Sequence, residues 1–173
     1  MAVVLEIDES NGGTETVTDG ITQIVAGSLD QQSNTLTPGA APLTPGTPAY
    51  EKWLRFHFTA LGGAAAVSTL KVWAAAPPAE HTFQWNGHIV QATYASANHV
   101  QTTYAAAATS STRTPEVLPT SEPASANVGI AGLLAGSLSA VGRSDYILLQ
   151  VRPTALALAG STIIVSFGYQ IVA

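Results

Sequence analysis

The clearest pattern along this chain is an alternation of apolar and polar residues with a period of two. It is strongest in three segments, which are Tyr50–Thr59, Asp145–Arg152 and Thr162–Val172. Because successive side chains of a strand point to opposite faces of a sheet, each segment predicts a half-buried strand. In the first, Leu54, Phe56 and Phe58 share one side, and Trp53 lies on the other, less apolar side. The many β-branched and aromatic residues support the same interpretation.

Shorter alternating runs predict further strands. These are Val3–Ile7, Thr14–Thr18, Ile21–Ala26, Val67–Trp73, His88–Tyr94 and Val100–Ala105. Asn86–Gly87 is typical of a tight hairpin turn and predicts a hairpin over Phe83–Val90, while Gly62–Gly63 predicts another turn. About nine strands are enough for two packed sheets. We therefore expect an all-β fold, a β-sandwich of jelly-roll type formed by one domain over residues 1–173, with its first and last strands as neighbours.

The segment Val128–Val141 does not follow the period of two. Its large apolar residues have near-helical spacing, but each of its three internal glycines costs a helix about 1 kcal/mol relative to Ala. A short helix and an irregular segment or strand pair are equally compatible with it.

Two stretches rich in Pro, Ser and Thr predict long loops, Gly27–Ala49 and Ala108–Ala126. Loops of this length are usually functional or disordered. Each is compatible with a mobile surface loop and with a tether that lies across a neighbouring subunit.

The chain carries unusually little charge. Asp, Glu, Lys and Arg make up 10% of its 173 residues, against roughly 25% in an ordinary soluble domain. The net charge of −5 and the scattered basic residues exclude a basic nucleic-acid-binding stripe. Six of the eleven acidic residues lie in the first thirty positions and predict a solvated acidic arm over Met1–Glu9 rather than a catalytic dyad.

Other features limit the classes of function. The absence of Cys excludes disulfides and thiolate metal sites. No run approaches the roughly 18 apolar residues of a membrane helix, and the first residues lack the pattern of a signal peptide. We expect no membrane partner and a protein that stays in the cytoplasm unless it leaves as part of something larger.

No catalytic constellation is evident. His57, His81, His88 and His99 lack the close spacing of a metal site, and neither a serine-nucleophile elbow nor a phosphate-binding loop occurs. We expect no catalytic, cofactor-binding or metal-binding residues. Trp53, Trp73 and Trp85 favour core or interface packing, with a sugar-binding platform as the alternative.

A surface poor in charge suits contact with another protein, because interface cores are depleted in charge. The expected contact residues lie in the N-terminal arm, in the first long loop and at two tryptophans. They are Val3, Val4, Leu5, Leu36, Pro38, Leu43, Pro45, Trp53 and Trp85.

Two strings, Glu51–Trp73 and Ser144–Ala173, resemble virion accessory proteins of tailed bacteriophages, over about a third of the chain. The resemblance is one of packing pattern, so no functional residue is carried over. It implies a non-enzymatic β-sandwich in the virion that decorates or cements a capsid, or forms part of a tail, baseplate or fibre. The implied partner is the major capsid protein or another virion protein. Self-association is also expected, as a trimer first and a dimer second.

Overall fold

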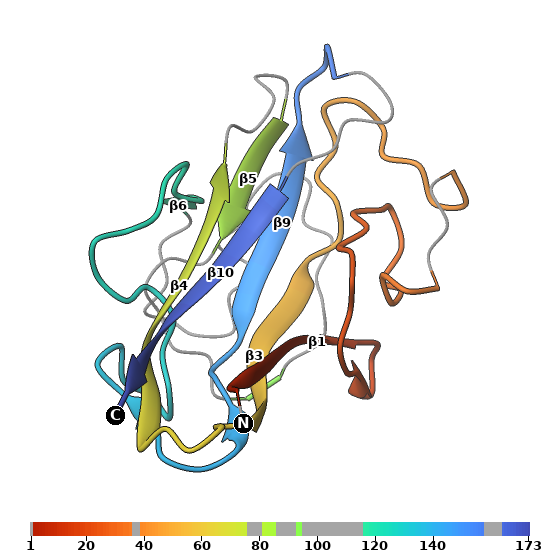
Figure 1. Ribbon diagram of the computed structural model, residues 1–173. Helices are drawn as coiled ribbons and strands as arrows, with labels where there is room; N and C mark the ends of the chain where they lie inside the picture. The colour runs from red at the N-terminus through yellow and green to blue at the C-terminus, as the bar shows by residue number, and fades with distance from the viewer. Residues whose placement is uncertain (1, 36–38, 76–80, 86–92, 95–115, 158–163) are drawn as a thin grey trace.

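The computed structural model describes residues 2–35, 39–75, 81–85, 93–94, 116–157 and 164–173 (Figure 1). Within these residues the regular structure consists of strands, and no helix occurs, which confirms the all-β prediction. The same part of the chain accordingly has no helix with the length and hydropathy needed to cross a membrane.

The described strands form two antiparallel sheets. Their bounds are β1 Val4–Asn11, β2 Thr16–Thr18, β3 Lys52–Ala60, β4 Ala66–Ala75, β5 His81–Trp85, β6 Glu116–Val117, β7 Ser137–Leu138, β8 Gly142–Arg143, β9 Ile147–Pro153 and β10 Ile164–Val172. The larger sheet has the order β2-β1-β3-β9-β5-β6, with β8 also paired to β3, and the smaller sheet has the order β10-β4-β7.

The main core lies between the two sheets. The predicted inward side of β3, formed by Leu54, Phe56 and Phe58, is fully buried. Aromatic rings from β10 close on it, since Phe167 meets Phe56 edge-on at 5.5 Å and Tyr169 meets Phe58 at 5.2 Å. The period of two in β3 and β10 therefore identified the facing sides of the two sheets.

A turn at Gly62–Gly63 takes the chain from β3 in one sheet to β4 in the other. Both glycines have positive φ, and the Ala64 amide donates to the Leu61 carbonyl at 2.9 Å. This backbone matches a tight turn that a side chain would strain, as predicted for this pair.

The opposite face of the larger sheet carries a second, smaller core. Trp53 is fully buried there beside Tyr146 and Leu148, and Tyr94 packs against the group. The Trp53 ring meets Tyr94 at 5.0 Å and Tyr146 at 5.4 Å, both edge-on. Of the core and interface packing expected for Trp53, the structure shows core packing. Its selection as a contact residue is therefore corrected, because aromatic residues from two distant segments cover its ring on the less apolar side of β3.

Other strand predictions also need correction. Residues Ile21–Ala26 form no strand, because the Ile21 amide donates to the Ile7 carbonyl and the Val25 amide to the Ser33 hydroxyl instead of forming a ladder. The first and last strands are not neighbours, since β1 pairs with β3 and β10 pairs with β4.

The ambiguous segment Val128–Val141 contains no helix. It forms a tight turn in which Ile130 and Leu133 exchange backbone hydrogen bonds, followed by β7. Ala131 and Gly132 have positive φ values of 49° and 89°, which a helix does not allow. The irregular alternative is thus the observed one.

Several predictions fall outside the described residues. These are the hairpin turn at Asn86–Gly87, most of His88–Tyr94, all of Val100–Ala105 and residues 108–115 of the second long loop. The jelly-roll type of sandwich stays a prediction.

Candidate functional site

The acidic N-terminal segment is built into the larger sheet. β1 pairs with β3 from Val4 opposite Ala60 to Ser10 opposite Trp53, and with β2 at its other edge. Asp8 and Glu9 are fully buried, so the prediction of a solvated arm is wrong. The physical reason is that basic residues distant in sequence lie beside each of the two carboxylates.

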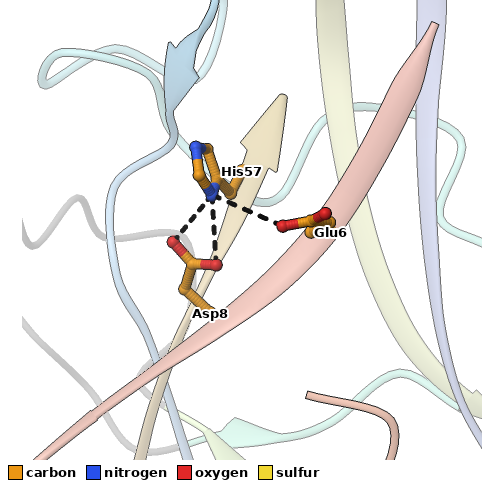
Figure 2. A group of neighbouring side chains, drawn as sticks. All are labelled: Glu6, Asp8 and His57. Carbon is orange, nitrogen blue, oxygen red and sulfur yellow. Dashed lines mark hydrogen bonds and ion pairs between the residues drawn. The ribbon is translucent and has the colours of Figure 1, made fainter. Parts of the chain in front are cut away.

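Glu6, Asp8 and His57 form a cluster on one face of β1 and β3 (Figure 2). Their ligand-type atoms all lie within 4.8 Å of one another. His57 Nδ1 is 3.1 Å from Asp8 Oδ2 and 3.9 Å from Glu6 Oε2. The alternation in β1 places the two carboxylates on the same side, and the register places Glu6 opposite His57.

Arg143 of β8 completes this cluster. Its Nε donates to Asp8 Oδ2 at 2.6 Å, and its Nη2 donates to Asp19 Oδ1 at 3.0 Å. The hydrogen bond to Asp8 is the main reason why the pKa of Arg143 is raised. Burial raises the pKa of Asp19, but the hydrogen bond from Arg143 and the charge of its guanidinium outweigh this effect, so the pKa falls below its usual value.

The guanidinium of Arg143 decides what the cluster can do chemically. Glu6, Asp8 and His57 are groups that bind divalent cations in other proteins. Here Arg143 Nη2 lies 3.4 Å from His57 Nδ1, the same nitrogen that would face a cation. Arg143 thus provides the positive charge, and the arrangement is an ion-pair network that joins β1, β3, β8 and the segment at Asp19.

A second buried pair anchors the first long loop. Lys52 Nζ donates to Glu9 Oε1 at 2.8 Å, with only 4% and 0% of the two side chains exposed. The same ammonium donates to the Gln31 carbonyl at 2.5 Å, and the Ser33 amide donates to Glu9 Oε2 at 2.8 Å. Farther along, the Gly46 amide donates to the Thr154 carbonyl at 3.2 Å. The described parts of Gly27–Ala49 are therefore held by their own domain.

A third polar group lies beside the smaller core. Tyr146 donates a short hydrogen bond to Glu15 Oε1, and Ser10 donates to the same oxygen at 2.7 Å. Burial and the Glu15 carboxylate raise the pKa of Tyr146 to about 12. Burial also acts to raise the pKa of Glu15. The hydrogen bonds from Tyr146 and Ser10 act in the opposite direction and outweigh burial, so the pKa of Glu15 lies below its usual value. Tyr146 therefore keeps its proton at neutral pH and acts as a donor.

The predicted contact residues occupy different environments. Val4 is 44% exposed, Val3, Leu5 and Leu43 are half-buried, and Pro45 is exposed. Trp85 pairs with Leu149 in the larger sheet. Leu36 and Pro38 lie outside the described residues.

Sequence reasoning missed other exposed apolar side chains. Leu133 is 65% exposed and Val141 is 61% exposed, and neither is among the predicted contact residues. A signal was present, because Leu133 and Val141 each adjoin a glycine that belongs to a turn or a short strand. It also missed the pairing of Arg143 with Asp8, for which no local pattern exists.

Comparison with protein-family models, with curated proteins and with solved structures returned no match to this chain.

Proposed function

We propose that this protein is a non-enzymatic structural component of a phage particle, a capsid decoration or cement protein that docks through one end of its sheets. The observation that supports the proposal best is a group of exposed apolar side chains on segments next to the end of β3 and the start of β4. Both chain termini lie at this same end of the sheets (Figure 1). The group consists of Val4, Leu133 and Val141, and we call it the end surface.

The strand registers place two members of the end surface on either side of the last residues of β3. Val4 lies opposite Ala60 at one edge of β3, and Gly142, next to Val141, lies opposite Phe58 at the other edge. Leu133 belongs to the tight turn that leads into β7. The three side chains are 44%, 65% and 61% exposed. Exposed apolar groups gathered in one region are typical of sites that contact another macromolecule.

The distribution of charge supports the same proposal. At least five of the 17 charged residues (six basic and eleven acidic) are buried: Asp8, Glu9, Glu51, Lys52 and Asp145. The surface is therefore even poorer in charge than the composition indicates. Such a surface suits a broad protein interface more than a solitary domain, whose solubility depends on exposed charge.

Two alternatives differ in how they are tested. A tail, baseplate or fibre component would share the same surface properties but occur in few copies per particle. A sugar-binding module is the second alternative. Trp53 can no longer serve as one of its three candidate stacking residues, because the ring is fully buried and offers no face to a sugar.

The test begins with purified particles of the phage that encodes this chain. Quantitative mass spectrometry compares its copy number with that of the major shell protein. A ratio near one copy per shell subunit, or per symmetric group of subunits, supports decoration. A few copies per particle indicate a tail component, and absence from the particle overturns the proposal.

A binding experiment then tests the end surface. Particles that lack the protein are incubated with purified protein and separated by sedimentation. Val141→Asp should weaken binding strongly, whereas Val117→Asp should not, although both valines are about equally exposed at 61% and 59%. Val117 lies on β6 at the far edge of the larger sheet and serves as the matched control. Equal binding by both variants would contradict docking through the end surface.

A further inference from the structure

Among the described residues, strand β10 lies at one edge of the smaller sheet. It pairs with β4 on one side, and among the described residues no strand pairs with its other side. None of its nine residues is buried, while Val67, Leu70, Val72 and Ala74 of the neighbouring β4 are at most 1% exposed. Its ends are the most apolar part of this edge, with Ile164 72% exposed and Val172 43% exposed.

This edge lacks the usual protection against pairing with another chain. Natural edge strands carry Lys, Pro or a bulge that prevents a second strand from adding. β10 has no charged residue and no proline. The irregularity between β10 and β4 places its extra residue on β4, where Thr69 has a positive φ of 54°. The backbone of β10 thus presents an uninterrupted edge.

The sequence of β10 is nearly symmetric about its central residue, Gly168. An antiparallel copy centred on Gly168 would place like beside like: Ile164 with Val172, Val165 with Ile171, Ser166 with Gln170, and Phe167 with Tyr169. Apolar residues then face apolar ones, the polar residues face each other, and the aromatic residues form cross-strand pairs, which stabilise antiparallel sheets. Because the strand is uncharged, pairing with itself brings no like charges together.

We propose that β10 pairs with β10 of a second copy about a two-fold axis at Gly168, joining the two smaller sheets into one continuous sheet. The pairing is self-complementary, as a two-fold interface requires. It goes beyond the proposed function and does not depend on it, because a dimer would serve any assembly. It favours a dimer as the basic unit over the trimer expected from the sequence.

Apolar surface also lies at one end of this edge. An open hollow lies beside the C-terminal end of β10, lined by Val3, Leu61, Tyr169 and Ile171 among others. In the proposed register the partner's Val165 would lie beside Ile171 at this hollow. The pairing would therefore cover apolar surface as well as satisfy the backbone groups of β10.

The test uses a charge pair that depends on the register. Ile164 and Val172 are exposed, and their neighbours on β4 are the small residues Ala75 and Ala66. Within one chain the two positions lie about 26 Å apart along the strand, too far to interact. The variant Ile164→Lys with Val172→Lys places Lys against Lys twice in the dimer. The variant Ile164→Lys with Val172→Glu places Lys against Glu twice.

Sedimentation velocity from low to high micromolar concentration measures association, and circular dichroism checks that each variant is folded. We expect the unsubstituted protein to dimerise and the Lys/Lys variant to be monomeric. We expect the Lys/Glu variant to dimerise at least about tenfold more tightly than the Lys/Lys variant at low salt, with a smaller difference at high salt.

Three results would overturn the proposal: a monomer at every concentration, a trimer, or equal association of the two double variants. The last result would mean that apolar contact without this register holds the copies together. The Val141→Asp variant separates the two proposals. If it loses particle binding but still dimerises, the end surface is needed for docking and is not needed for β10 pairing.

Discussion

Replacing Lys52 by Met should destabilise the protein far more than a typical surface substitution. The Lys52–Glu9 pair is almost completely buried, so Lys52→Met leaves a buried carboxylate with one remaining donor, the Ser33 amide at 2.8 Å. Leaving one member of such a pair unpaired costs about 3–5 kcal/mol. Because domains of this kind have a free energy of unfolding of about 5–15 kcal/mol, the loss is a large fraction of the total.

Urea denaturation followed by tryptophan fluorescence measures this cost, since the buried Trp53 adjoins Lys52. Lys71→Met is the matched control. Lys71 pairs with Glu122 at a similar distance, 2.9 Å, but Glu122 is 59% exposed, so the control should lose no more than about 1 kcal/mol. Adding Glu9→Gln to Lys52→Met removes the stranded charge and should restore about 2 kcal/mol.

If Lys52→Met costs no more than Lys71→Met, or if the double variant is no more stable than Lys52→Met alone, the buried pair does not stabilise the fold in this way. A second measurement follows the loop itself. Because Lys52 and Glu9 hold Gln31 and Ser33, amide hydrogen exchange should accelerate around these two residues in Lys52→Met.

Three further predictions concern the polar groups and one turn. The pKa of Tyr146 is raised from 10.0 to about 12, so its contribution to stability is complete below pH 10 and is lost as the pH rises towards 12. Unfolding free energies between pH 9 and 11.5 should therefore fall about 1–2 kcal/mol less in Tyr146→Phe than in the unsubstituted protein, and parallel pH profiles would contradict this. Ala131→Asn should raise the free energy of unfolding by about 1 kcal/mol, because Asn tolerates the positive φ of 49° better than Ala. Urea denaturation measures this free energy, and a lower value in the variant would contradict the turn described at Ala131. Arg143→Ala should let Zn²⁺ raise the melting temperature through Glu6, Asp8 and His57, while Zn²⁺ leaves the unsubstituted protein unchanged; an equal response of both would show that the guanidinium does not compete with the cation.

The period of two was sufficient to predict three of the longer strands and the inward side of β3. It placed β3, β9 and β10 within about two residues and identified Leu54, Phe56 and Phe58 as core. This works because alternation is a local property of an extended chain next to an apolar layer. The turn at Gly62–Gly63 was predictable for a similar reason, since its positive φ values depend on the residues themselves.

The partners of those strands and of the buried charges were decided only in three dimensions. Asp8 meets Arg143 across 135 positions of sequence, and Trp53 is covered by Tyr94 and Tyr146 on a face that its own strand marks as weakly apolar. Which carboxylate is buried, and which side of a sheet is covered, depends on contacts between distant segments. A local pattern of residues contains no record of those contacts, so the acidic arm became an inner strand and the predicted interface tryptophan became core.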